Sequence, residues 1–313
     1  RKACGFESHL RHNSMKPKVL VILGPTATGK SDLAVKIALK HRGEVISADS
    51  RQVYKGLDIG TGKVTKEEML GIHHWLLDVI SPQKTFSVAD YKNLAEEKIK
   101  TILKRSKLPI IVGGTGFYIQ SIVDDLILPE VPADENLRNE LSKKSLEELV
   151  SMLQNLDPER TKTIDTKNKV RLIRAIEISK TLGKVPKVKK AKSKYDFLQI
   201  GLTLSPEEIR VKIKKRLILR VKKGMIEEAE KLHKKGLSFE RMRELGLEYR
   251  YLADLLEQRI SKREFIEKLE TAIYQYSKRQ MTWFKRDKSI KWFNPKDTKK
   301  IDMAVKYFLT QQI

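Results

Sequence analysis

The chain has 313 residues, of which 40% are hydrophobic, so it is long enough to bury a core in one large or two moderate domains. No apolar run approaches the ~18 residues of a membrane span, and we expect a soluble protein. The 64 Lys and Arg residues against 40 Asp and Glu give a net charge of +24, which indicates a polyanionic partner such as RNA, DNA or an acidic membrane surface. One cysteine, Cys4, excludes an internal disulfide framework and is typical of a reducing cytoplasm.

Residues 1–14 carry no periodic pattern and precede Met15. We interpret them as a remnant of a cloning vector and leave them out of the predicted fold.

The first functional signal is the segment Gly24-Pro25-Thr26-Ala27-Thr28-Gly29-Lys30-Ser31, which fits the pattern G-x-x-x-x-G-K-[ST] at every fixed position. An apolar, strand-like run (19–23) precedes it and a helical pattern (31–39) follows, as a phosphate-binding loop requires. In such a loop, backbone N–H groups and the lysine bind phosphate oxygens, and the serine hydroxyl can bind Mg²⁺. The alternative is an ordinary glycine turn.

Two further strands are predicted to end at polar groups. The strand 44–50 carries Asp49 at its end, and the strand 109–112 is followed by Gly113-Gly114-Thr115-Gly116, where a nucleotide hydrolase would more usually have a Walker-B aspartate. Because ligands bind at the carboxyl ends of parallel strands, Asp49 is expected to lie near the ligand of Lys30. With a helix at 87–103 between them, the run 18–116 predicts a parallel α/β core.

The pattern changes near Asp124, and helical periodicity continues from residue 135 to 182. We predict a small all-helical insertion, residues 123–195, within an α/β core of residues 15–122 and 196–313. Arg171 and Arg174 share one helix face in this insertion, where the alternative is a solvated basic stripe. The run 184–194 has six lysines and no acid, so we expect it to be mobile and to bind polyanions.

Strand character returns at 197–204, and helices are predicted at 206–235, which includes Arg216, and at 262–286. Nine basic residues against two acidic ones lie between 278 and 300, interleaved with Trp283, Phe284, Trp292 and Phe293. Single-stranded nucleic acid is bound by such a combination of stacking and charge, although Trp292 and Phe293 are favoured as core residues.

Together these segments resemble the tRNA dimethylallyltransferases, also called tRNA isopentenyltransferases. The resemblance covers the chain from Lys18 onward and rests on the residue segments 24–31, 47–61, 77–79, 113–116, 171–177 and 278–284. It implies a core like that of the P-loop NTPases, flanked by helices. It also implies transfer of a dimethylallyl group from dimethylallyl diphosphate to the exocyclic N6 of the adenosine 3′ to the anticodon of tRNA, with release of diphosphate.

The resemblance also implies roles for particular residues. Gly24 to Ser31 and Arg216 would bind the donor diphosphate with Mg²⁺ at Ser31, Asp49 would be the base, and Thr115 would hydrogen-bond near the reacting groups. The implied tRNA contacts are Asp49, Ser50, Arg51, Gln52, Thr115, Arg138, Val170, Arg171, Leu172, Ile173, Arg174, Arg243, Arg250, Lys278 and Arg279. Where many family members have a glycine-tyrosine pair, this chain reads Gly246-Leu247-Glu248-Tyr249-Arg250. The resemblance also implies a cytoplasmic protein that binds no membrane, needs no obligate protein partner and can be a monomer.

Three alternatives stay open at this point. A P-loop small-molecule kinase would use the loop for ATP, but it needs neither the net charge of +24 nor the lysine run. An adenylate isopentenyltransferase would use the same donor on a nucleotide, and the basic insertion and tail disfavour it. A nucleic-acid-binding module without catalysis leaves the Asp49 and Thr115 loops without a role.

Overall fold

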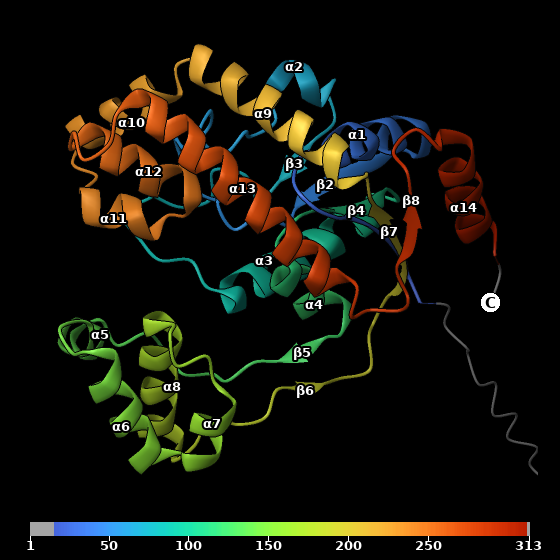
Figure 1. Cartoon of the computed structure of the whole chain (residues 1–313). Coiled ribbons are helices and arrows are strands. Elements are labelled where there is room, and N and C mark those ends of the chain that lie inside the picture. The colour runs from blue at the N-terminus through green and yellow to red at the C-terminus, as the bar shows by residue number, and fades with distance from the viewer. Residues whose placement is uncertain (1–15, 312–313) are drawn as a thin grey trace, which may run out of the picture. The chain divides into compact units, whose positions relative to one another are not determined.

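The computed structural model describes residues 16–311 (Figure 1). Residues 1–14 and Cys4, which the sequence assigns to a vector remnant, lie outside the described residues.

The core is a six-stranded sheet of order β3-β2-β4-β1-β7-β8, in which every neighbouring pair is parallel. The predicted α/β class is therefore confirmed. The strands are β1 (Lys18–Leu23), β2 (Gly43–Ser47), β3 (His74–Trp75), β4 (Leu108–Gly113), β7 (Asp196–Leu202) and β8 (Lys291–Phe293). In the centre, Leu20 of β1 pairs with Ile110 of β4 on one side and with Leu198 of β7 on the other.

Strand β1 is apolar at nearly every position because both faces of the sheet are covered. Val19, Val21 and Leu23 point to one face, where α3 (Val88–Lys104) and α4 (Gly116–Val123) pack. Leu20 and Ile22 point to the other, where α1 (Lys30–His41) and α14 (Thr298–Thr310) pack. The alternation of side chains along the strand thus divides the core of the sheet into two layers.

A separate helical cluster packs around a third apolar core beside the sheet (Figure 1). It consists of α9 (Pro206–Lys222), α10 (Met225–Lys234), α11 (Phe239–Glu244), α12 (Leu247–Leu256) and α13 (Lys262–Phe284), while the short α2 (Lys66–Met69) lies in the loop before β3. The helix predicted at 206–235 is divided, because Gly224 adopts a φ of +99° that helical residues cannot have. Capping boxes at Ser87, Ser205 and Ser261 begin the three longest helices.

Residues Asp124–Lys192 form a second compact unit, close to the interval 123–195 expected from the sequence. Its helices are α5 (Glu135–Ser142), α6 (Leu146–Leu156), α7 (Pro158–Thr163) and α8 (Lys169–Leu182), packed around Leu141, Leu149, Leu153, Leu172 and Ile176.

The expectation of an all-helical insertion was wrong in one respect. Strand β5 (Leu126–Ile127) pairs antiparallel with β6 (Lys189–Lys190), so part of the lysine run forms a two-stranded ribbon. The ladder uses only backbone groups, and both lysine side chains remain exposed, which suits an edge strand. Lys190 also forms an ion pair of 2.8 Å with Asp124.

Within residues 16–311, no helix combines the length and the apolar character that crossing a membrane would require.

Candidate active site

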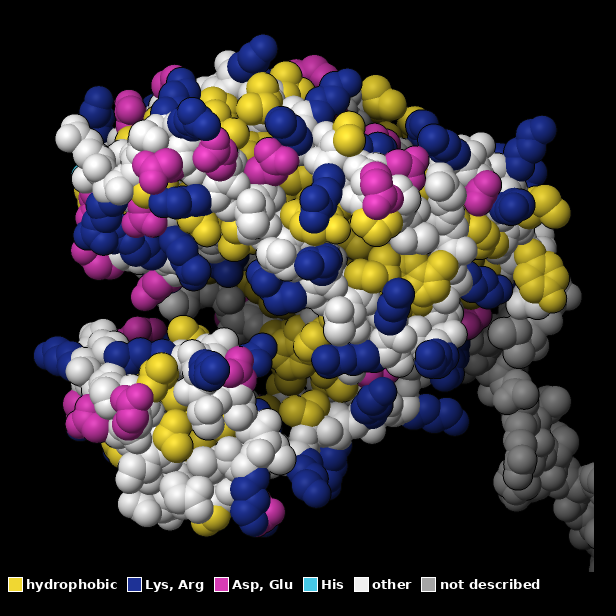
Figure 2. All heavy atoms as spheres, viewed as in Figure 1, with side chains coloured by type: hydrophobic (Ala, Val, Ile, Leu, Met, Phe, Trp, Pro, Cys, Tyr) yellow, Lys and Arg dark blue, Asp and Glu magenta, His cyan; other side chains and the backbone are white. Residues whose placement is uncertain are grey.

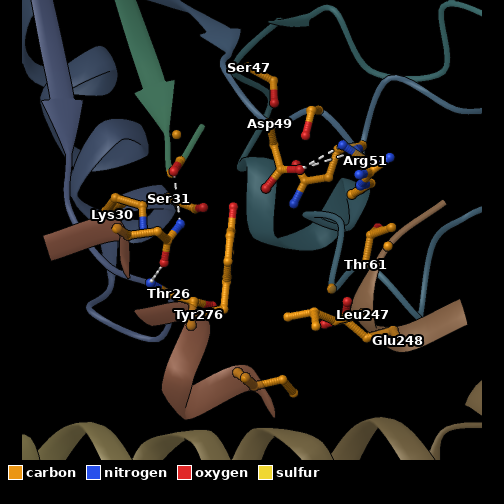
Figure 3. A pocket seen from close by; sticks show the side chains of 18 of the residues that line it. Thr26, Lys30, Ser31, Ser47, Asp49, Arg51, Thr61, Leu247, Glu248 and Tyr276 are labelled. Carbon is orange, nitrogen blue, oxygen red and sulfur yellow. Dashed lines mark hydrogen bonds between the residues drawn. The ribbon is translucent and has the colours of Figure 1, made fainter. Parts of the chain in front are cut away.

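A cavity of about 380 Å³ lies where the strands β1, β2 and β4 end (Figure 3). It is lined by the loop after each of these strands and by residues from α9, α12 and α13. The phosphate-binding loop, the Asp49 segment and the Gly113-Gly114 turn are therefore brought together, as parallel topology predicts.

The loop 24–31 has the backbone of an anion cradle. Gly24 has a φ of +137°, and a Cβ there would lie 2.4 Å from the carbonyl oxygen of Leu202. Gly29 has a φ of +84° and caps the N-terminus of α1, whose free N–H groups favour an anion. The Nζ of Lys30 donates a 2.6 Å hydrogen bond to the carbonyl oxygen of Pro25, and the hydroxyl of Thr28 donates one of 2.9 Å to the same oxygen.

Lys30 has an unusual protonation equilibrium. Burial of its ammonium group, followed by the nearby positive charge of Arg216, lowers the pKa of Lys30 to about 7, and Asp49 opposes this shift. A negatively charged ligand in the cradle would favour the charged form of the lysine.

Asp49 lines the cavity, and Thr115 lies just behind it, joined to the Asp49 segment through Ser50. Oδ1 of Asp49 accepts hydrogen bonds from the backbone N–H groups of Arg51 (2.9 Å) and Gln52 (3.4 Å), and the rest of the carboxylate faces the cavity (Figure 3). The N–H of Ser50 donates to Oγ1 of Thr115 over 3.0 Å. Both predicted residues thus have fixed positions, and Asp49 lies across the cavity from Lys30 (Figure 3).

Arg216 of α9 lines the cavity with an exposed side chain. Desolvation of the guanidinium by the surrounding protein, followed by the nearby positive charge of Arg220, lowers the pKa of Arg216. Arg220 is held by the carbonyl oxygen of Gly60 (2.6 Å) and by Glu248 (3.2 Å). A Cβ on Gly62 would lie 3.2 Å from Nη2 of Arg216, so the glycine-rich loop allows the guanidinium to approach closely.

Glu228 is a residue that sequence reasoning missed. Its carboxylate accepts hydrogen bonds from the successive N–H groups of Asp58 (3.1 Å), Ile59 (2.7 Å) and Gly60 (2.9 Å), and from the hydroxyl of Tyr249 (2.6 Å). It therefore fixes the loop that contacts Arg216. Nothing local in the sequence marks Glu228, because its backbone partners in the loop lie about 170 residues away in the chain.

The tRNA contacts predicted outside the second unit divide into two groups. Arg51, Arg250 and Arg279 line the cavity together with Ser50 and Gln52.

Arg243 and Lys278, like Thr115, do not line the cavity. The guanidinium of Arg243 is bound by the carboxylates of Asp254 (3.0 Å) and Glu257. Lys278 lies over the ring of Tyr274, with Nζ 5.3 Å from its centroid.

In the second unit, two arginines that were predicted to contact tRNA are paired with one buried carboxylate. Arg138 donates two 3.0 Å hydrogen bonds to Glu177, and Arg174 binds the same carboxylate. These bonds outweigh burial and hold the pKa of Glu177 below its usual range. Arg171 is exposed, with Asp165 3.5 Å away.

The apolar residues of helix α8 also differ in position. Val170 is 75% exposed, whereas Leu172 is 0% exposed and Ile173 packs against the core of the unit. Helical spacing turns the side chain of Leu172 into the core of the unit, and the RNA contact predicted for this residue stays a prediction.

His74, Tyr276 and Gln280 are among the further residues that line the cavity. Burial, followed by the charge of Asp49, raises the pKa of Tyr276 to about 12. His74 uses Nδ1 for a 2.9 Å hydrogen bond to the carbonyl oxygen of Ile72, and burial lowers the pKa of His74.

The donors available for a metal are few. Ser31 lines the cavity, but between residues 16 and 311 no three His, Cys, Asp or Glu side chains are grouped to hold a metal ion. Magnesium usually keeps several waters and takes its other ligands from one or two protein groups and substrate phosphates. The residues present therefore fit a Mg²⁺ that arrives with a diphosphate, held through the Ser31 hydroxyl.

A phosphate-binding loop that faces a carboxylate across a cavity, at the carboxyl ends of parallel strands, is the arrangement expected of an α/β enzyme. Comparison with known proteins identifies the family. The sequence profile of the IPP transferase family matches residues 52–287. The chain belongs to the IPP transferase family, a family of transferases, as its motifs indicated.

Individual relatives are similar to this chain over most of its length. A tRNA dimethylallyltransferase of Anoxybacillus flavithermus is 40% identical over 288 residues, which cover 90% of this chain and 92% of the relative. The crystal structure of a tRNA isopentenylpyrophosphate transferase of Bacillus halodurans is 36% identical, with a TM-score of 0.70, and covers 93% of this chain and 96% of its own. A eukaryotic dimethylallyltransferase acting on tRNA is 25% identical, with a TM-score of 0.71 over 86% of this chain and 70% of its own.

Proposed function

We propose that this protein transfers a dimethylallyl group from dimethylallyl diphosphate to N6 of the adenosine next to the anticodon, on its 3′ side, in tRNA. The observation that carries the proposal is that one cavity contains both Lys30 of the phosphate-binding loop and the carboxylate of Asp49. A leaving diphosphate and a proton acceptor are the two requirements of this reaction. Relatives named for the same activity support the assignment.

The chemistry follows from the charges around the cavity. N6 of adenine attacks C1 of the allylic donor, the C1–O bond breaks, and the bonding electrons leave with diphosphate. Lys30, Arg216 and the N–H groups at the start of α1 stabilise the charge that accumulates there. When bound, Mg²⁺ would add positive charge at the same oxygens.

The amine loses a proton in the same reaction. Exocyclic amines are weak nucleophiles, so a carboxylate that accepts this proton favours the attack. Asp49 is the proposed base, because its Oδ1 is fixed by the N–H groups of Arg51 and Gln52 while the carboxylate faces the cavity. Thr115, hydrogen-bonded to Ser50, is proposed to orient the reacting amine.

The acceptor must leave its base stack to enter the cavity, which requires a protein surface that holds the flanking RNA. Arg51, Arg250 and Arg279 supply positive charge in the cavity itself. Along α13, cations lie over aromatic rings: Arg279 over Tyr276 and Lys278 over Tyr274, with Arg286 over Trp283 just beyond the helix. Many further Lys and Arg side chains lie on the face shown in Figure 2. We propose that these groups bind the anticodon arm, with Arg171 and the lysine run of the second unit as further contacts.

The proposed setting follows from the acceptor. We propose a cytoplasmic enzyme that needs no obligate protein partner and is able to act as a monomer.

The test is incubation of the protein with unmodified tRNA and dimethylallyl diphosphate, followed by mass analysis of the nucleosides. Dimethylallyladenosine at the position next to the anticodon is expected with the wild type. Asp49→Asn should bind tRNA normally and lose about 10²- to 10⁴-fold in turnover, the usual range for a general base. Absence of modified adenosine with the wild type would refute the function, and near-normal turnover of D49N would refute the assigned base.

A further inference from the structure

Gln280 of α13 is a buried side chain, 7% exposed, that connects two of the three loops around the cavity. Its Oε1 accepts a 2.9 Å hydrogen bond from the N–H of Thr26 in the phosphate-binding loop. Its Nε2 donates a 2.8 Å hydrogen bond to the carbonyl oxygen of Gly114. The first of these bonds is the dashed line at Thr26 in Figure 3. One amide thus bridges the loops that follow β1 and β4.

A second set of hydrogen bonds connects the residue after Gly114 to the loop that carries Asp49. Thr115, the next residue, donates its N–H to the carbonyl oxygen of Ala48 (3.2 Å) and accepts the N–H of Ser50 at Oγ1 (3.0 Å). Asp49 lies between these two partners. The contacts therefore run without interruption from Thr26, through Gln280 and Thr115, to the backbone on either side of Asp49.

The strand pairs of the sheet end before the tips of the two loops. Its ladder ends at the pairs Leu23 with Gly113 and Ser47 with Val112, whereas Thr26 and Asp49 lie beyond the ends of their strands. Two hydrogen bonds from Gln280 of α13 connect the loop after β1 to the turn after β4. That turn is joined to the Asp49 loop by Thr115 and by the N–H of Ala48, which donates to the carbonyl oxygen of Val112 over 2.7 Å.

The side chain of Gln280 and the Asp49 loop both pack closely against the glycine pair Gly113-Gly114. A Cβ on Gly114 would lie 2.3 Å from Nε2 of Gln280, and a Cβ on Gly113 would lie 2.1 Å from the carbonyl oxygen of Ala48. Neither position has room for a side chain. The two glycines are needed so that Gln280 and the Asp49 loop can both contact the turn.

We propose that Gln280 is a positioning residue that sets the separation between the diphosphate cradle and Asp49. The inference rests on the proposed function, because that reaction requires the donor carbon to lie in reach of an amine whose proton Asp49 accepts. A displacement of about 1 Å in such an arrangement can cost about 10²-fold in rate. Glutamine is suited to bridging the two loops because the end of its side chain carries both a hydrogen-bond acceptor and a donor.

The test uses Gln280→Met, which keeps the length of the side chain and removes both hydrogen bonds. Gln199→Met is the matched control, because Gln199 is 5% exposed and donates to Asp287 (2.8 Å) and Ser289 (2.6 Å) away from the cavity. We expect Q280M to lower the single-turnover rate of transfer at least about tenfold. Its Kd for inorganic diphosphate and for tRNA should stay within about threefold, while Q199M keeps its rate within about twofold at a similar loss of thermal stability.

A second variant decides the question even if Q280M does not fold. In Gln280→Glu, the ionised side chain still accepts from Thr26 but repels the carbonyl oxygen of Gly114. When protonated, it donates to that oxygen and restores the bridge. Burial and Asp49 raise the pKa of this carboxyl, and the cations Lys30, Arg51, Arg216 and Arg279 around the cavity lower it. The ratio of the Q280E rate to the wild-type rate should therefore rise as pH falls from about 8 to about 6.

Three results would overturn the inference: a Q280M rate within twofold of the wild type, an equal loss of diphosphate affinity and rate, or a Q280E ratio that does not change with pH. Failure of the inference is distinct from failure of the function. A wild type without transfer activity would refute the proposed function, whereas an active wild type with an unaffected Q280M refutes only the role of Gln280.

Discussion

The pKa of Lys30 leads to a quantitative prediction about diphosphate binding. In the free protein the pKa is about 7, since burial and Arg216 disfavour the ammonium form. A bound diphosphate favours that form, so binding takes up a proton and weakens as pH rises above 7. Between about pH 7.5 and about pH 9, the charged fraction of Lys30 falls about 25-fold for a pKa of 7, and Kd should rise by about the same factor. Arginine side chains stay charged over this range and add no slope.

Calorimetric titration with inorganic diphosphate, repeated in buffers of different ionisation enthalpy, measures both Kd and the proton uptake. Uptake should approach one proton per diphosphate near the upper end of the range. Lys30→Met should bind weakly and lose the part of the pH dependence that comes from the lysine, so that only the ionisation of diphosphate itself contributes over the same interval. A wild-type Kd that stays constant, or an equal slope in K30M, would refute the assignment of Lys30 as the titrating group that binds diphosphate.

Three further predictions concern RNA binding, the second unit and the cradle. Replacing Lys187, Lys189, Lys190 and Lys192 by alanine should weaken tRNA binding. It should also reduce the magnitude of the slope of log K against log salt by up to ~0.9 per lost phosphate contact. An unchanged slope would indicate that the lysine run is only a solvated loop. Leu172→Ala should lower the free energy of unfolding by about 2–5 kcal/mol because it leaves a cavity, whereas Val170→Ala on the exposed side of α8 should change it by less than about 0.5 kcal/mol in denaturant titrations. Gly24→Ala should abolish diphosphate binding through the 2.4 Å clash with Leu202, and calorimetry that detects normal binding would contradict the geometry described for the loop.

Local patterns were sufficient to predict the core of the fold. The apolar runs around Leu20, Ile46 and Ile111 are long and buried on both faces, and the segment 24–31 fixes where the first strand ends and the first helix begins. Parallel topology then brings Asp49 and Thr115 to the same edge as Lys30, so three of the proposed site residues could be placed from the sequence.

What the sequence could not predict depends on partners far away in the chain. The division of the helix 206–235 at Gly224 requires knowledge of a positive φ, and the pairing of Lys189 with Ile127 depends on backbone groups that carry no side-chain signal. Arg243 reads as a free basic residue until Asp254 and Glu257 fold against it. Gln280 lies in a segment that the resemblance includes, but its two hydrogen bonds span 254 and 166 residues.

The most direct test of the whole account asks which ligand the phosphate-binding loop accepts. The wild type and Lys30→Ala would be assayed for transfer to tRNA from dimethylallyl diphosphate with and without ATP, and for phosphate release from ATP alone. We expect equal transfer by the wild type in both conditions, no ATP hydrolysis, and a large loss of kcat/KM in K30A through donor binding or diphosphate departure. Strict dependence on ATP, or rapid ATP hydrolysis without modified adenosine, would contradict this expectation and favour a kinase.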